Sequence, residues 1–376
     1  MHGREIVDLF AGPGGLDVAA YRLGIPAIGI EWDADACETR RKATLRTVQG
    51  DVRLSKPSKF PDATILAGGP PCQTYTVAGN GAGRRALDVV LGFAKRMAAG
   101  EDVTSDLKML ADERTGLVLE PLRWALAAIR ADRPYEAVVL EQVPAVLPVW
   151  KAVGEILEGE GYSVACGVLR TEQYGVPQTR RRAVLVARLS GKAALPAPTH
   201  RPYRKGVSRA EGDPKLSPWV TMNDVLKRPE PFVVVSNYGT GGDPKARGRR
   251  HSAEPAATVT GKISRNRVVS LEGRELDRFT HSEAGQLQTF PADFPWAGRD
   301  VAQQIGNAVP PRLAIHVLAA ALDIGGDVLD RALLETATWR ETLSQEEWEP
   351  QHLLSATAYQ RRTPSGRSAL LINGLP

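Results

Sequence analysis

The chain has 376 residues and a formal net charge of +5, and its 43% hydrophobic and 24% charged residues describe a folded globular protein rather than a disordered one. It has no apolar run near the ~20 residues that span a membrane and no signal-peptide pattern, so we expect a cytoplasmic protein without a membrane partner. The three cysteines, at positions 37, 72 and 166, are too few for a disulfide framework and lack C-x-x-C spacing, so we expect no metal site.

Short apolar strands alternate with helical stretches in the first half of the chain. We expect strands at 4–10, 26–30, 63–67, 136–140 and 184–187, and helices at 16–23, after Asp33 as a capping residue, and at 121–129. This alternation is typical of an α/β protein whose parallel sheet is covered by helices.

The composition changes after Arg188, where prolines and turn residues become frequent and strands such as 232–235 are short. A helical segment returns at 312–322, whereas an insertion with helical propensity at 88–112 has no role that the sequence assigns. We therefore expect four parts: a first domain over 1–188, a smaller irregular domain over 189–298, a return to the first domain over 299–345, and a polar tail over 346–376.

Chemically distinctive residues follow the expected strands at their carboxyl ends. They are a glycine-rich turn at 11–15, Glu31, Cys72 and Glu141. In open α/β sheets, ligands bind in the crevice outside these ends. The Cys72 thiol, on a loop with two glycines and two prolines, is either a positioned nucleophile or a small buried hydrophobe. Glu141 is either an acid in that crevice or a helix-capping carboxylate.

The glycine turn and its neighbours indicate a cofactor. The turn Gly12-Pro13-Gly14-Gly15 has Asp17 where a dinucleotide-binding turn has its third glycine, and it carries no Lys or Arg for a pyrophosphate. Glu31 can accept hydrogen bonds from both hydroxyls of a ribose. Trp32 can stack on an adenine or pack in the core, and Asp51 can accept from an adenine amino group or cap a turn. S-adenosylmethionine (SAM) fits this set better than NAD.

Basic residues are concentrated in the segment 201–275, which holds 15 Lys and Arg against 8 Asp and Glu. This balance is typical of a polyanion-binding module on an enzyme, or else of an arginine-rich solvated surface. Two groups of basic residues follow turn-forming glycines and can approach phosphates: Arg84 and Arg85 after the Cys72 loop, and Lys245, Arg247, Arg249 and Arg250 in this segment.

Six segments match the motifs of one family in their usual order: DLFAGPGG at 8–15, GPPCQ at 69–73, EQV at 141–143, QTRRR at 178–182, LQTFP at 287–291 and QIGNAVPP at 304–311. On these motifs the chain resembles the DNA (cytosine-5)-methyltransferases along most of its length. The resemblance implies an α/β fold with a Rossmann-like SAM-dependent methyltransferase domain and a smaller, irregular target-recognition domain.

The resemblance also implies a reaction, namely methyl transfer from SAM to C5 of a cytosine flipped out of a specific duplex DNA sequence. In that reaction Cys72 would add to C6, Glu141 would protonate N3, and Arg182 would contact O2 with Arg180 supporting it. We expect Arg181, between these two arginines, to point away.

The remaining implied roles concern the cofactor, the DNA and partners. Cofactor contacts are expected from Phe10, Gly12, Gly14, Glu31, Trp32, Asp51, Pro70 and Asn307. DNA contacts are expected from Arg84, Arg85, Gln178, Lys245, Arg247, Arg249 and Arg250. We expect a monomer acting on double-stranded DNA, either beside a cognate restriction endonuclease or as an orphan or phage enzyme.

One departure and two alternatives stay open. Gln142 stands where the family usually has Asn after the catalytic glutamate, a position that steadies the nucleophile loop. An RNA (tRNA) cytosine-5 methyltransferase of the same fold is one alternative, although the Cys-Phe-Thr typical of those relatives is absent. A catalytically weak DNA-binding relative is the other, although Cys72, Glu141 and the glycine turn are all present.

Overall fold

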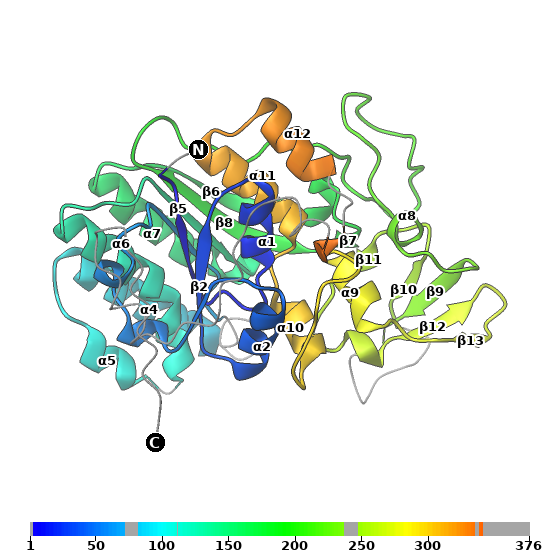
Figure 1. The fold of residues 1–376 in the computed structure, drawn as a ribbon, viewed down its shortest axis with the longest axis horizontal. Coiled ribbons are helices and arrows are strands. Elements are labelled where there is room, and N and C mark those ends of the chain that lie inside the picture. The colour runs from blue at the N-terminus through cyan, green and yellow to red at the C-terminus, as the bar shows by residue number, and fades with distance from the viewer. Residues whose placement is uncertain (1–2, 72–81, 111, 237–246, 335–337, 341–376) are drawn as a thin grey trace, which may run out of the picture.

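The computed structural model describes residues 3–71, 82–110, 112–236, 247–334 and 338–340. A seven-stranded sheet with helices on both faces forms the larger part, and a smaller four-stranded sheet lies beside it, at the right of Figure 1. The strand order of the large sheet is β3-β2-β1-β4-β5-β8-β6. Its strands are β1 (Ile6–Leu9), β2 (Ala27–Glu31), β3 (Thr47–Gln49), β4 (Ile65–Gly68), β5 (Ala137–Gln142), β6 (Ser163–Arg170) and β8 (Arg181–Arg188).

The expected parallel sheet is confirmed from β3 to β5, where each strand pairs with its neighbour in parallel. The expectation is wrong for β8, which runs antiparallel to both β5 and β6. The chain passes from β6 to β8 through a 3-10 turn, η5 (Thr171–Tyr174), and the two-residue strand β7 (Gln178–Thr179). Such a short connection has no room for the crossover helix that parallel pairing requires.

Alternate side chains of the same strand face two separate cores, because successive residues of a strand point to opposite sides. Val7 and Leu9 face the core covered by α4 (Ala82–Ala98), α6 (Glu120–Arg130) and α7 (Leu147–Gly159). Ile6 faces the other core, which α1 (Gly15–Arg22), α11 (Pro311–Leu322) and α12 (Gly326–Leu334) cover. The segment that holds α11 and α12, near the end of the described chain, therefore completes the second face of the large sheet.

Helix α2 (Ala34–Lys42) begins as expected after Asp33, whose side chain accepts a hydrogen bond from the Ala36 amide at 2.8 Å. The insertion at 88–112 holds most of α4 and the short helix α5 (Thr104–Lys108). Among the described residues, the stretch Val301–Leu322 is apolar and long enough to span a membrane, but 78% of its most apolar window is buried inside the protein. It is a core element of the fold.

The smaller part contains an antiparallel sheet with the order β10-β9-β12-β13. Its elements are α8 (Met222–Val225), β9 (Phe232–Val235), β10 (Arg249–His251), β12 (Arg267–Ser270), β13 (Glu275–Leu276) and α9 (His281–Leu287). Helix α10 (Val301–Asn307) packs Val301 and Ile305 into the core of this part. Strand β11 (Ala256–Ala257) pairs in parallel with β7. The two parts are therefore joined at α10 and at β7.

Candidate active site

The glycine turn after β1 requires its glycines. Gly12 and Gly14 have φ angles of 55° and 104°, in the left-handed region that favours glycine. A Cβ atom on Gly14 would lie 2.3 Å from Leu45 Cδ1, and one on Gly15 would lie 2.0 Å from the Val309 carbonyl oxygen. Glycine at position 15 thus lets the start of α1 contact Val309 of the QIGNAVPP segment, which lies 294 residues later in the chain.

Glu31 ends β2 beside this turn. Its Oε2 atom accepts a hydrogen bond from the Gly12 amide at 2.7 Å, and its Oε1 atom accepts one from the Asp33 amide at 2.7 Å. Burial raises the pKa of the Glu31 carboxyl group, and these two hydrogen bonds oppose that rise. Each oxygen has a second lone pair, so the carboxylate keeps the capacity to accept from a ligand.

Trp32 follows Glu31 with 71% of its surface exposed. The core-packing alternative for this ring is therefore wrong. Phe10, on the other side of the glycine turn, has a φ angle of 61°, an uncommon value for a residue other than glycine. Phe10 thus lies at the turn, partly buried against the core of the large sheet, whereas the Trp32 ring is exposed.

Asp51 caps the 3-10 turn η1 (Val52–Leu54), accepting from the Arg53 amide at 2.9 Å and from the Arg53 guanidinium at 2.7 Å. Burial acts to raise the pKa of Asp51, but the hydrogen bonds and charge of Arg53 outweigh it, so the pKa lies below its ordinary value. The capping alternative for Asp51 is thus observed, and a role in binding adenine stays a prediction.

A cavity of about 580 Å³ opens beside Asp51. Its lining includes Met97, Val103 and Leu107 of the 88–112 insertion, and also Leu117 and Leu126. The insertion, to which the sequence assigns no role, therefore lines a pocket next to a predicted cofactor residue.

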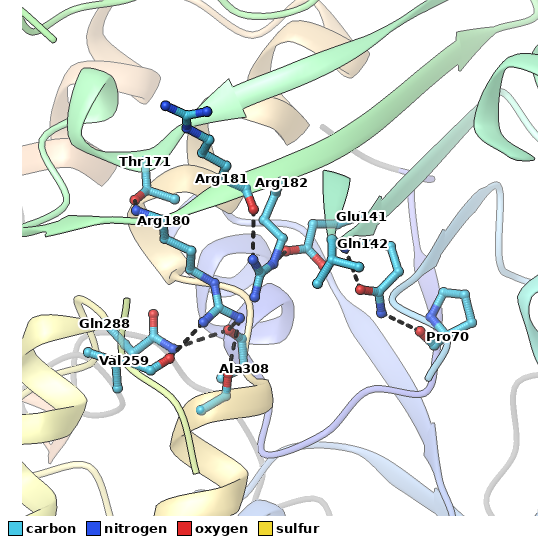
Figure 2. A network of polar contacts seen from close by, with 12 residues as sticks. Pro70, Glu141, Gln142, Thr171, Arg180, Arg181, Arg182, Val259, Gln288 and Ala308 are labelled. Atoms are coloured by element: carbon cyan, nitrogen blue, oxygen red, sulfur yellow. Dashed lines mark hydrogen bonds and ion pairs between the residues drawn. The ribbon is translucent and has the colours of Figure 1, made fainter. Parts of the chain in front are cut away.

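Cys72 lies outside the described residues, but the segment that leads to it is described. The Gln142 side-chain amide donates a hydrogen bond to the Pro70 carbonyl, and its oxygen accepts one from the Val143 amide. A Cβ atom on Gly69 would lie 3.9 Å from Glu141 Oε2. The end of β5 and the segment before Cys72 are thus side by side, and Gln142 connects them (Figure 2).

Glu141 and Arg182 form an ion pair with 2.7 Å between Oε1 and Nε, and their side chains are 12% and 11% exposed. They come from paired strands, because Glu141 of β5 is the register partner of Val184, two residues after Arg182 on β8. Figure 2 shows Arg182 pointing to Glu141 and Arg181 pointing away from both. The fold thus brings these two predicted catalytic residues together.

Two other predicted site residues are buried, and their side chains form hydrogen bonds with backbone groups of the protein. The Gln178 side chain is fully buried, donates to the Leu287 carbonyl at 2.9 Å and accepts from the Val259 amide at 3.0 Å. The prediction that Gln178 contacts DNA is therefore wrong. Arg180 is 2% exposed and donates to the carbonyls of Val259 at 2.9 Å and Gly306 at 3.0 Å. These hydrogen bonds connect β7 and β8 to the segments around Val259 and Gly306, so Arg180 acts as a positioning residue in this structure.

The predicted DNA-contacting arginines are partly described. Arg249 is exposed, and Arg247 and Arg250 are half-buried. The Arg250 guanidinium lies 4.8 Å from the centre of the Tyr203 ring and 3.5 Å from the Thr179 hydroxyl. Lys245 and the side chains of Arg84 and Arg85 lie outside the described part. Asn307, at the end of α10, is exposed and accepts a hydrogen bond from Gln303 at 2.7 Å.

One buried ion pair near the glycine turn was not predicted from the sequence. Arg40 of α2 donates to both carboxylate oxygens of Asp17 at 2.7 and 2.8 Å, and the two side chains are 0% and 2% exposed. Asp17 stands out in the sequence only as a residue in place of a glycine. In the described part of the chain, no group of three His, Cys, Asp or Glu side chains is arranged to hold a metal ion.

Comparison with known proteins points to one family. The family model described as C-5 cytosine-specific DNA methylase matches residues 4–95 and 104–322. Type II methyltransferase M1.HphI of Haemophilus parahaemolyticus is 28% identical over 353 residues, which cover 84% of this chain and 86% of that protein. Type II methyltransferase M.NgoFVII of Neisseria gonorrhoeae is 28% identical over 362 residues, covering 86% and 87%.

Solved structures show the same fold at lower sequence identity. A putative DNA modification methyltransferase encoded within a prophage of E. coli has 18% identity and a TM-score of 0.54, and the match covers 85% of this chain and 99% of that one. The Dnmt2 methyltransferase of S. pombe has 16% identity and a TM-score of 0.55, with 85% and 98% covered.

Proposed function

The chain belongs to the C-5 cytosine-specific DNA methylases and is a DNA cytosine-5 methyltransferase, and we propose that it acts on a flipped-out cytosine of a specific duplex sequence through a covalent bond from Cys72 to C6. The observation that carries this proposal is the Glu141–Arg182 pair, which lies beside the segment that leads to Cys72. A cytosine stacked in a duplex does not expose its ring face to a thiolate. The base must therefore flip out of the helix, and the lost stacking and pairing cost a few kcal/mol.

In the proposed chemistry, C5 of cytosine becomes nucleophilic only after addition at C6. The Cys72 thiolate forms the bond to C6, and the ring electrons move toward C5 and N3. The edge of the base enters between Glu141 and Arg182, with N3 and the amino group toward Glu141 and O2 toward Arg182. Glu141 holds the proton at N3. Loss of the C5 proton and elimination of the thiol then restore the aromatic ring.

SAM, when bound, supplies the methyl group that C5 receives. We propose that Glu31 accepts from its ribose hydroxyls, that the exposed Trp32 ring stacks on its adenine, and that Asp51 lies at the adenine edge. The other proposed contacts are Phe10, Gly12, Gly14, Pro70 and Asn307. The free lone pairs of Glu31, the exposure of Trp32 and the cavity beside Asp51 support this arrangement.

The DNA is proposed to lie between the two parts of the protein, with 189–298 as the target-recognition domain and 299–345 returning to the catalytic domain of 1–188. Arg247, Arg249 and Arg250, together with Lys245, Arg84 and Arg85, are proposed to contact it. The similarity to type II methyltransferases supports a restriction-modification context. A cognate endonuclease, a cytoplasmic location and a monomeric state are part of this proposal.

Bisulfite sequencing of DNA and RNA from an expression host without cytosine-5 methylation tests the function. We expect 5-methylcytosine in DNA at one sequence context, and none when Cys72→Ala is expressed in its place. Methylation confined to RNA would favour the RNA methyltransferase alternative. A folded protein that binds DNA and methylates neither nucleic acid would favour the catalytically weak relative.

A further inference from the structure

Three arginines gather on the side of the β6–β8 pair that faces away from Glu141, the side to which Arg181 points in Figure 2. Arg170 and Arg181 are direct register partners in the antiparallel pairing of β6 with β8. Partners of this kind have their Cβ atoms about 5 Å apart, and like charges there repel each other. Arg250 of β10 reaches the same region, because its guanidinium contacts the hydroxyl of Thr179, just before this strand.

Glu172 interacts electrostatically with all three arginines, so one acidic group faces three positive charges. Its side chain is buried, with 4% exposed, and its Oε2 atom has no hydrogen-bond partner in the described part of the chain. Burial raises the pKa of Glu172, and the charges of Arg170, Arg181 and Arg250 oppose that rise. None of the three arginines forms an ion pair with a carboxylate among the described residues.

The Arg250 side chain is held ready for a ligand. Its guanidinium stacks over the ring of Tyr203 at 4.8 Å, and the Tyr203 hydroxyl in turn donates to the Glu254 carboxylate. An arginine held in this way loses less side-chain freedom when it binds than a free one does. Arg181 is exposed, and Arg170 and Arg250 are half-buried, so the guanidiniums can reach a ligand from solvent.

We propose that Arg170, Arg181 and Arg250 form a binding site for one phosphodiester group of the DNA backbone. This inference rests on the proposed function and adds a contact that positions the duplex without reading its sequence. Arg181 and Arg182 are consecutive residues at the start of β8 and point to opposite sides. In this proposal Arg182 contacts the base, and Arg181 contacts a phosphate. Guanidinium groups suit this ligand because they bind phosphate oxygens in a bidentate manner.

The salt dependence of DNA binding tests the site. Affinity for a random-sequence duplex and for the methylated target, identified by bisulfite sequencing, would be measured by fluorescence anisotropy at several NaCl concentrations. Because one phosphate contact contributes about 0.9 to the slope of log K against log salt, we expect Arg181→Gln and Arg250→Gln each to reduce the slope by up to about 0.9 on both duplexes. The triple variant, which adds Arg170→Gln to these two substitutions, should reduce the slope by no more than about 0.9, because all three arginines bind the same phosphodiester group.

Arg188→Gln is the matched control, because Arg188 lies on the same strand at the opposite edge of the sheet, where it pairs with Ala137. The Arg188→Gln variant should leave the slope of log K against log salt unchanged. The Arg181→Lys variant, which keeps the positive charge, should retain most of that slope. An unchanged slope in the triple variant, with a native melting temperature, would overturn the proposal. A loss of discrimination between target and random duplex would also overturn it, as that indicates base reading. Continued cytosine-5 methylation in either case would leave the proposed function standing.

Discussion

Gln142 departs from the family pattern but still forms a hydrogen bond to the segment that leads to Cys72. The family usually has Asn here, and the longer Gln side chain still donates to the Pro70 carbonyl, two residues before Cys72. The sequence predicted that this position steadies the nucleophile loop. It did not predict the partner, because Gln142 and Pro70 are 72 residues apart and meet only through the pairing of β4 with β5.

Replacing Gln142 by Ala should lower kcat for methyl transfer by about 10- to 100-fold, because the loop before Cys72 loses a buried hydrogen bond and small displacements of a reacting group are costly. The KM for SAM should change little. Gln142→Asn, which keeps the amide, should retain more activity than Gln142→Ala. Transfer of labelled methyl groups to saturating duplex DNA measures this. Equal rates for Gln142→Ala and the unaltered enzyme would show that the contact has no role in the reaction.

Among the secondary-structure elements, α10 depends on a glycine at its contact with Thr260 and Gly261. A Cβ atom on Gly306 would lie 2.2 Å from the Gly261 amide nitrogen and 2.4 Å from the Thr260 carbonyl carbon. These are backbone atoms, which cannot turn aside as a flexible side chain can. The closeness also places the Gly306 carbonyl within reach of Arg180.

Gly306→Ala should therefore destabilise the protein by about 1–3 kcal/mol through overpacking, as measured by urea unfolding. The matched control is Gly92→Ala in α4, where an added Cβ atom has no neighbour within 4 Å. That substitution should stabilise the helix by roughly 0.5–1 kcal/mol, because alanine is the better helix former. Equal unfolding free energies for the two variants would contradict the close contact at α10.

Helix α11 carries a buried histidine that makes stability depend on pH. His316 packs against the Tyr174 ring at 5.3 Å, and burial, together with the charges of Arg312 and His200, lowers its pKa from 6.5 to about 4. The unfolded chain takes up this proton near pH 6.5, whereas the folded chain does so only near pH 4. The stability that neutral His316 contributes above pH 6.5 is thus lost as the pH falls toward 4.

We expect the free energy of unfolding to fall between pH 7 and pH 5, and to fall by about 2 kcal/mol less in His316→Leu. Urea unfolding at the two pH values measures the difference. His200 has a pKa of about 4 for the same main reason, burial, so part of the pH dependence should persist in the variant. An identical pH dependence in both proteins would contradict the assigned role of His316.

For the molecule as a whole, the sequence predicted the elements that local pattern determines and missed those that distant partners determine. The strands that end at the glycine turn, Glu31 and Glu141 were predicted from apolar runs and are confirmed. The strand at β8 was predicted, but its antiparallel direction was not, and β6 was not predicted, since pairing between strands is not visible in a short run. Arg180 and Gln178 looked like ligand contacts because their partners, Gly306 and Leu287, lie 126 and 109 residues away.

In the proposed mechanism Cys72, which follows the segment beside the Glu141–Arg182 pair, forms a covalent bond to C6 of the target cytosine. A duplex with 5-fluorocytosine at the target position can trap this adduct. Fluorine at C5 prevents the final loss of a proton, so the cysteine stays attached to C6. With SAM present, we expect a complex of enzyme and duplex that survives denaturing electrophoresis, for the unaltered enzyme and for Cys37→Ala, and no such complex for Cys72→Ala. An enzyme that methylates ordinary duplex but yields no complex, or a complex that persists in Cys72→Ala, would contradict the covalent role of Cys72.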